Sequence, residues 1–193
     1  MNIVIRKLTP NLAEDYIKFF DDTPHDNNID EHKCYCVGWC SENSESKDFS
    51  SREKRKNIAL QYVKEGKIQG YLAYCDDEIV GWCNANIKSD CLNCDGWRRF
   101  MEYVPVEEQN IKVKSIFCFV IAPKMWRTGI ATQLLERVCQ DATQDGFGFV
   151  EAYPYKEDAW QTSNFSGYYA MYERAGFSLL CETEKGVVVR KQL

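Results

Sequence analysis

The stretch KVKSIFCFVIAPKMWRTGIATQLLERVCQDATQDG, residues 112–146, decides the fold. It opens on a β-branched and aromatic run, Ile116 to Ile121, which is typical of a buried strand. Pro123 then ends the strand, because proline has no backbone N–H to donate to a sheet. Beyond it, apolar residues recur four apart while polar residues fill the other face, which predicts an amphipathic helix covering the sheet. The apolar positions are Ile130, Leu134 and Val138.

The turn between this strand and this helix, Trp126 to Ala131, places a glycine where the chain enters the helix. The first amides of a helix have no intrahelical partner and lie at the positive end of its dipole. Gly129 would let a ligand approach the backbone closely. The turn therefore suits a phosphate or pyrophosphate group, and an ordinary strand-to-helix turn that binds nothing is the alternative.

The segment FVIAPKMWRTGIATQLLERV, residues 119–138, resembles the acetyl-CoA-binding segment of the GNAT superfamily of N-acetyltransferases. In that family a loop of pattern Gln/Arg-x-x-Gly-x-Gly/Ala wraps the pyrophosphate of coenzyme A. Gly129 and Ala131 match the last two places, whereas Trp126 stands in the first. The resemblance implies that the backbone of this loop binds the pyrophosphate. The implied residues are Arg127, Thr128, Gly129, Ile130, Ala131 and Thr132.

The N-terminal half of the chain adds further strands and helices. A strand is expected at Ile3–Lys7, followed by a helix that Thr9 caps with its hydroxyl and Pro10 opens. A second helix is expected at Arg52–Gly66. Two apolar runs separated by acidic residues predict a β-hairpin over Gly70–Asn84.

Residues Ala85 to Ile111 show little periodicity and are expected to form a long loop over the site, because loops of this length are often functional lids. After the central helix, a strand is expected at Phe147–Tyr153 and a short helix at Ser166–Ala175, closed by Gly176. The last two strands are expected at Phe177–Cys181 and Val187–Lys191.

This succession combines an antiparallel meander with one βαβ crossover, which predicts an α+β fold. It is similar to the GNAT fold over nearly the full chain: a mixed, mainly antiparallel central sheet flanked by helices. A second GNAT-like motif, Tyr-x-x-x-Gly-Phe, is present as Tyr172, Gly176 and Phe177. The 193 residues are expected to form a single domain, with loop insertions at about 21–51 and 85–111.

Composition excludes several classes of protein. The chain has no run of 18 apolar residues, which argues against a membrane span, and its N-terminus lacks the apolar stretch of a secretory signal. A cytoplasmic location is therefore expected. The net charge of -5 argues against a nucleic-acid binder and mildly favours a cationic substrate.

Ten cysteines leave a second interpretation open. Cytosolic thiols stay reduced, and several of these cysteines are explained by packing as small apolar residues. Cys91-x-x-Cys94 has the spacing of a zinc knuckle, and Cys34, Cys36, Cys40 and His32 could add ligands. No second knuckle pair is present, so no metal is expected, and a structural zinc or a thiol redox switch is kept as the alternative.

The resemblance also implies catalytic roles. Tyr172 would be the acid that protonates the departing thiolate of coenzyme A, with a structural core tyrosine as the alternative. Glu151 lies among apolar neighbours in its strand, so its pKa would be raised and it would accept the amine proton directly or through water. A structural strand glutamate is the alternative for Glu151.

The backbone of Phe119, Val120 and Ile121 would pair with the pantetheine arm, and the amide near Ile121 would polarise the thioester carbonyl. Asn164 stands eight residues before Tyr172 and is similar to a cofactor-contacting asparagine of the family. An aromatic acceptor pocket could be lined by Trp39, Trp82, Trp97 and Tyr153, although such residues are more often core.

The sequence therefore predicts an enzyme, an N-acetyltransferase that moves the acetyl group of acetyl-CoA to a primary amine. The acceptor is either a small molecule or a protein, and a homodimer is possible by resemblance. The alternatives are a coenzyme A-binding regulator without turnover and a cysteine-cluster zinc or redox protein on the same fold.

Overall fold

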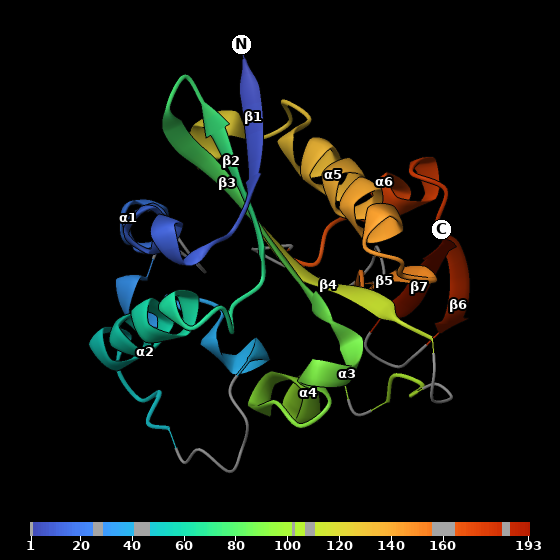
Figure 1. Cartoon of the computed structure of the whole chain (residues 1–193), viewed down its shortest axis with the longest axis horizontal. Helices are drawn as coiled ribbons and strands as arrows, with labels where there is room; N and C mark the ends of the chain where they lie inside the picture. The colour runs from blue at the N-terminus through green and yellow to red at the C-terminus, as the bar shows by residue number, and fades with distance from the viewer. Residues whose placement is uncertain are drawn as a thin grey trace.

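A seven-stranded sheet crosses the molecule in the spatial order β1-β2-β3-β4-β5-β7-β6 (Figure 1). The computed structural model describes residues 2–24, 29–40, 47–101, 103–106, 111–155, 165–182 and 186–193. The strands are β1 (Ile3–Lys7), β2 (Gly70–Cys75), β3 (Glu78–Ile87), β4 (Val113–Ile121), β5 (Phe149–Ala152), β6 (Ser178–Glu182) and β7 (Val187–Gln192). Neighbouring strands are antiparallel except β4 and β5, which are parallel. The predicted α+β fold with one βαβ crossover is confirmed.

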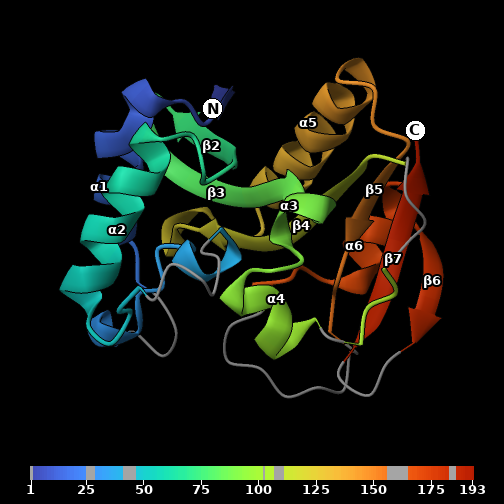
Figure 2. The same cartoon turned by 60° about the horizontal axis from the view of Figure 1, so that its bottom comes forward.

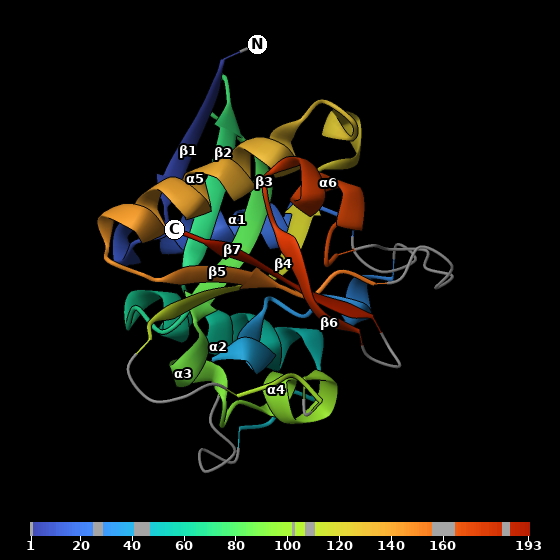
Figure 3. The same ribbon diagram turned by 90° about the vertical axis from the view of Figure 1, so that its right-hand side faces the viewer.

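Helices cover both faces of the sheet (Figure 2). The α-helices are α1 (Ala13–Asp22), α2 (Arg52–Lys64), α3 (Lys88–Cys91), α4 (Asp95–Phe100), α5 (Ile130–Gln144) and α6 (Tyr169–Arg174). Short 3-10 turns include η1 (Pro10–Leu12), η3 (Asp30–His32), η4 (Val37–Trp39) and η6 (Pro123–Met125). Helices α5 and α6 lie on the same face, as Figure 3 shows, and α1, α2 and α4 pack on the opposite face.

Helix α5 buries the stripe that the sequence predicts. Ile130, Leu134 and Val138 are each at most 1 % exposed and pack against Tyr71 and Ile116 of the sheet. Fully burying one such side chain stabilises the fold by about 1.5–3 kcal/mol. The strand β4 below it is buried along its length up to Val120. This βαβ unit therefore holds the turn between β4 and α5 in a fixed place.

The expected loop at Ala85–Ile111 is wrong in part. Strand β3 continues to Ile87, and helices α3 and α4 follow it. The polar side chain of Asn86 concealed the last part of the strand, yet Asn84 and Asn86 are both buried and the Asn86 amide donates to Asn84 Oδ1 at 2.6 Å. Their backbones pair with β4, which explains why a buried strand carries them.

Smaller differences concern element ends. Strand β4 begins at Val113, three residues before the predicted start, and α6 begins at Tyr169, three after it. Thr9 makes no side-chain capping bond, although Pro10 does open the helical segment, here as the 3-10 turn η1. None of the helices in the described residues has both the length and the apolar run that a bilayer span needs.

Candidate active site

The first turn of α5 presents unpaired backbone amides. Gly129 is the N-cap residue, with φ 86° and ψ 6°, and no side chain caps the helix. The Gln133 N–H is bonded to the Gly129 carbonyl at 3.0 Å, so the amides of Ile130, Ala131 and Thr132 precede the first intrahelical bond. A Cβ at Gly129 would meet no atom within 4 Å, so the space in front of this turn is open.

The residues before Gly129 extend the set of backbone amides at the start of α5. Arg127 has φ 61°, so two left-handed residues flank Thr128. Alternating backbone conformations of this kind turn successive N–H groups toward one point and bind anions. The Thr128 hydroxyl donates to the Met125 carbonyl at 2.6 Å and fixes the turn. The first turn of α5 carries no acidic residue, so the predicted segment from Arg127 to Thr132 has the geometry and charge for a diphosphate.

Beside this turn, strand β4 extends beyond its pairing with β5 in the described residues. It pairs with β5 only from Val113 to Ile116, while β4 continues to Ile121. The Ala122 N–H donates to the Val80 carbonyl at 2.9 Å, which fixes the alternation: the backbone groups of Phe119 and Ile121 point away from β3. We call this edge of β4, from Phe117 to Ile121, along which no pairing with β5 is described, the β4 gap.

The β4 gap corrects one predicted contact. The backbone of Val120 faces Trp82 of β3, so Val120 cannot pair with a ligand in the gap. Phe119 and Ile121 do face the gap, but protein groups bond to both. The Phe119 N–H donates to the Phe165 carbonyl at 2.6 Å, and the Trp126 indole Nε1–H donates to the Ile121 carbonyl at 2.9 Å.

Tyr172 lies next to the β4 gap. Its ring is fully buried on α6 and lies 6.5 Å from the Phe119 ring, centroid to centroid. Its hydroxyl donates to the Ser166 carbonyl at 2.7 Å. Burial raises the pKa of Tyr172 well above its usual value of 10.0, so the phenol keeps its proton. A general acid must hold a proton in this way before it donates it.

Glu151 lies at the centre of a buried charge network. Its side chain is fully buried on β5, and Oε1 accepts from Lys88 Nζ at 2.6 Å and from the Tyr153 hydroxyl at 2.8 Å. Oε2 accepts from the Arg190 guanidinium through both Nη2 and Nε, the latter at 3.1 Å. Because donors enclose both oxygens, the arrangement favours the structural alternative, and the base role of Glu151 stays a prediction.

The sequence did not identify Lys88 and Arg190, the cationic partners of Glu151. They lie 63 and 39 residues from it in the chain, so no local spacing links them. Arg190 is cross-strand from Glu151 in the β5–β7 register, which only the correct strand order reveals.

The predicted pocket aromatics do not form one group. Trp82 is fully buried in the core under α1 and α2. Trp39 stacks on Phe117 at 4.2 Å, Phe117 stacks on Tyr153 at 5.7 Å, and Trp97 meets both Phe117 and Tyr153 edge-on. This column lies beside the point where β4 and β5 part, because Phe117 and Tyr153 directly follow their last paired residues.

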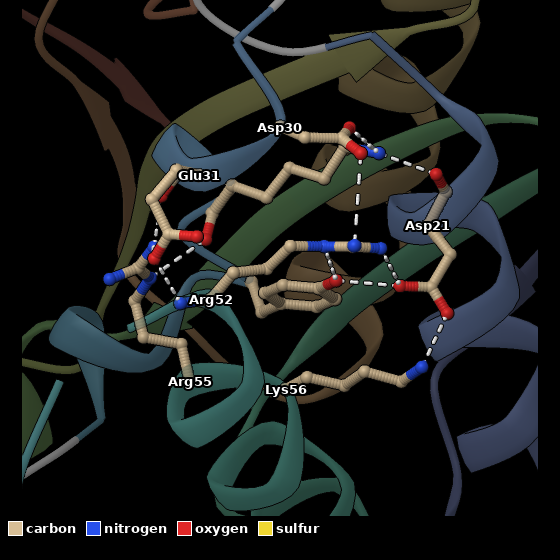
Figure 4. Close-up of polar contacts among 8 residues, drawn as sticks. Asp21, Asp30, Glu31, Arg52, Arg55 and Lys56 are labelled. Carbon is tan, nitrogen blue, oxygen red and sulfur yellow. Dashed lines mark hydrogen bonds and ion pairs between the residues drawn. The ribbon is translucent and has the colours of Figure 1, made fainter. Parts of the chain in front are cut away.

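A polar clamp between α1 and α2 holds the segment that carries Trp39 (Figure 4). Asp21 accepts from the Tyr35 hydroxyl at 2.6 Å and from Arg52 Nη2 at 3.0 Å, and it pairs with Lys56 at 2.8 Å. Lys33 is nearly buried and pairs with Asp30 at 2.8 Å. The clamp fixes a turn in which Tyr35 has φ 46° and Cys36 has φ 52°, conformations that side chains disfavour.

The remaining predicted residues are Asn164 and the cysteines. Asn164 lies outside the described residues. All ten cysteines are free thiols, and the sulfurs of Cys36 and Cys118 lie 3.4 Å apart. Within the described ranges, no group of three or more His, Cys, Asp or Glu side chains could hold a metal ion, so the zinc alternative finds no ligand set there.

Comparison with known proteins shows what this architecture is similar to. The sequence model of the acetyltransferase (GNAT) family matches residues 10–177. A search of curated proteins finds no match.

Solved structures share the fold at low identity. One is the PaiA N-acetyltransferase from Thermoplasma acidophilum in complex with coenzyme A, with a TM-score of 0.57, 12 % identity and 100 % of both chains covered. Another is the Drosophila melanogaster polyamine N-acetyltransferase that forms N-acetylagmatine, with a TM-score of 0.54, 13 % identity and 100 % of both chains covered. A third, described as a GNAT-family acetyltransferase from Desulfovibrio desulfuricans, has a TM-score of 0.53 and 16 % identity, with 99 % of both chains covered. At these identities the likeness shows a common fold.

Proposed function

The chain belongs to the acetyltransferase (GNAT) family of enzymes, whose co-substrate is acetyl-CoA, and on that premise we propose that it acetylates a primary amine. The observation that carries the proposal is the meeting of three features at the β4 gap. The turn at Gly129 contacts the gap through Trp126, the edge of β4 faces it with Phe119 and Ile121, and the Tyr172 ring lies beside Phe119.

Each feature supports one part of acetyl transfer. The amides from Arg127 to Thr132 would hold the diphosphate of acetyl-CoA, and the edge of β4 would align its pantetheine arm as a strand aligns a peptide. A backbone N–H on that edge would stabilise the negative charge that develops on the thioester oxygen. Acetyl-CoA supplies the activated acetyl group when it is bound there.

Proton transfer would involve Tyr172 and solvent. A primary amine must be neutral to attack the thioester carbon, and the bond to sulfur breaks as the amide bond forms. Tyr172 would give its proton to the departing thiolate and recover one from solvent. Glu151 is enclosed by Lys88 and Arg190, so we assign the amine proton to water and not to this carboxylate.

Replacing Tyr172 tests the proposal. Tyr172→Phe removes only the hydroxyl, so we expect kcat to fall by about 100-fold or more while the Kd of coenzyme A changes little. The measurement is thiol release from acetyl-CoA across an amine panel. Tyr16→Phe is the matched control, because the Tyr16 hydroxyl also donates to a buried backbone carbonyl, that of Tyr35 at 2.8 Å, on the opposite face of the sheet. Full activity of Tyr172→Phe would remove the acid role.

A coenzyme A-binding regulator without turnover is the second candidate. It is favoured by Trp126, which replaces the usual polar residue of the phosphate loop and is bonded to Ile121. Binding of coenzyme A without turnover on any amine of the panel would establish this role in place of catalysis.

We propose a small-molecule or protein amine as the acceptor, and neither nucleic acid nor membrane as a partner. Two structural relatives illustrate the range: the Drosophila enzyme acts on a polyamine substrate class, and the NatC complex is bound to Gag peptide. The ten free thiols support a reducing, cytoplasmic location. We also propose that the chain forms a single domain with a loop insertion at about 21–51 and that it assembles as a homodimer. The exposed edge strand β6 would be the surface for the second copy.

A further inference from the structure

Trp126 is a largely exposed side chain that nonetheless makes an internal hydrogen bond. It is 65 % exposed, which is unusual for a large aromatic residue, yet its indole N–H makes a well-formed bond to the Ile121 carbonyl at 2.9 Å. Sequence alone marked this residue only as a departure from the GNAT loop pattern. The structure gives it a contact at the β4 gap.

The bond to Ile121 is one of three internal hydrogen bonds at the gap. The Phe119 N–H is bonded to Phe165, and the Tyr172 hydroxyl is bonded to Ser166. A pantetheine arm aligned on β4 would need the edge groups of Phe119 and Ile121, and a thiolate would need the Tyr172 proton. The protein's own groups therefore bond to three of the groups that acetyl-CoA would use: the Phe119 N–H, the Ile121 carbonyl and the Tyr172 hydroxyl.

We propose that Trp126 is a cofactor-gating residue: its indole N–H occupies the Ile121 carbonyl until an amide N–H of the pantetheine arm replaces it. Binding of acyl-CoA is then an exchange of one hydrogen bond for another, and the indole moves into solvent. The inference rests on the proposed function, because it requires acyl-CoA to lie along the β4 gap.

Because the Trp126–Ile121 bond must break on binding, it should lower the affinity for coenzyme A. A bond that must break before the cofactor binds weakens binding by the strength of that bond, as any competing internal contact does. A neutral hydrogen bond at a partly exposed site corresponds to roughly two- to tenfold in an equilibrium constant. Removing the indole donor should therefore tighten coenzyme A binding by that factor.

Trp126→Phe is the test, because it keeps an aromatic ring and removes the N–H. We expect the Kd of coenzyme A, measured by calorimetry, to fall two- to tenfold relative to wild type. The wild type should also show a change in tryptophan fluorescence on adding coenzyme A, and this change should be largely absent in Trp126→Phe. Thr143→Val is the control variant, because it also removes a side-chain donor to a backbone carbonyl, that of Cys139 at 2.9 Å, near the other end of α5. It should keep both the Kd and the fluorescence change.

The possible results are distinct. An unchanged Kd in Trp126→Phe, or a fluorescence change that persists in it, overturns the gating role while leaving acyl-CoA binding intact. A higher Kd in Trp126→Phe also overturns the gating role, because it would mean that the indole contacts the bound cofactor. If neither wild type nor variant binds coenzyme A, the proposed function itself fails, and the inference fails with it.

Discussion

At the residue scale, Glu151 shows how a fully buried carboxylate can support the fold through its ion pairs. Its side chain is fully buried between Lys88 and Arg190, which are themselves nearly buried. Removing one member of such a network leaves charges without compensation in a medium that solvates them poorly. The network therefore stabilises the fold only as a complete set.

We predict that Glu151→Ala lowers the free energy of unfolding by about 3–5 kcal/mol, because it removes the buried carboxylate that Lys88 and Arg190 share. Chemical denaturation of wild type and variant measures this difference. Glu78→Ala is the control: Glu78 pairs with Lys124 on the surface, with side chains 64 % and 55 % exposed, so its loss should change stability by less than about 1 kcal/mol.

Glu151→Gln separates structure from catalysis. If Glu151 only supports the fold, the folded Gln variant keeps the shape of the pH profile of kcat/KM. Disappearance of an acidic limb from that profile, with the variant still folded, would restore Glu151 as the base.

At the scale of the element, α5 has one glycine at each end, and both have a positive φ that glycine adopts without strain. Gly129 has φ +86° and Gly146 has φ +73°, and an added Cβ meets nothing within 4 Å at either. Alanine at either position should therefore lower stability by about 1–2 kcal/mol, because the left-handed conformation disfavours a side chain. We predict that only Gly129→Ala also raises the Kd of coenzyme A, which calorimetry on both variants would measure. Equal effects of the two variants on Kd would exclude the Gly129 turn as the diphosphate site.

The elements that the sequence predicted well are those whose pattern is local. Strand β4 is a continuous apolar run, and helix α5 has apolar residues spaced four apart, so the sequence predicts both elements. The end of β3, from Ala85 to Ile87, is not predicted because Asn86 is polar but buried, and only pairing with β4 makes this segment part of the sheet. The Tyr172 position could be inferred from a motif, whereas the partners of Glu151 come from distant strands and helices and could not.

At the scale of the whole molecule, Lys114 couples stability to pH. It is 5 % exposed on β4, and burial, followed by the charge of Lys7, lowers its pKa from 10.5 to about 8. Below pH 8 the folded state carries a buried charge, so the full destabilisation is present. Between about pH 8 and 10.5 the folded state is neutral while the unfolded state still binds the proton, so this group makes stability rise with pH.

We predict that Lys114→Met raises the free energy of unfolding at pH 7 by roughly 2–3 kcal/mol. The gain should shrink as pH rises from about 8 to 10.5, and denaturation curves of both proteins across this range measure it. Comparison with wild type is needed because burial raises the pKa of Cys139 to about 11, which acts in the opposite sense at high pH. A difference that stays constant with pH would contradict the assignment.

Strands β5, β7 and β6 join the other four strands, in the described part of the sheet, through four parallel pairs from Val113–Phe149 to Ile116–Ala152. Mechanical load carried across the sheet concentrates on that short ladder. An extended ligand bound along Phe119 and Ile121 would add hydrogen bonds beyond the four pairs and would stiffen the connection between the two parts of the sheet. The protein would then be stiffer in the middle of its catalytic cycle than at either end of it.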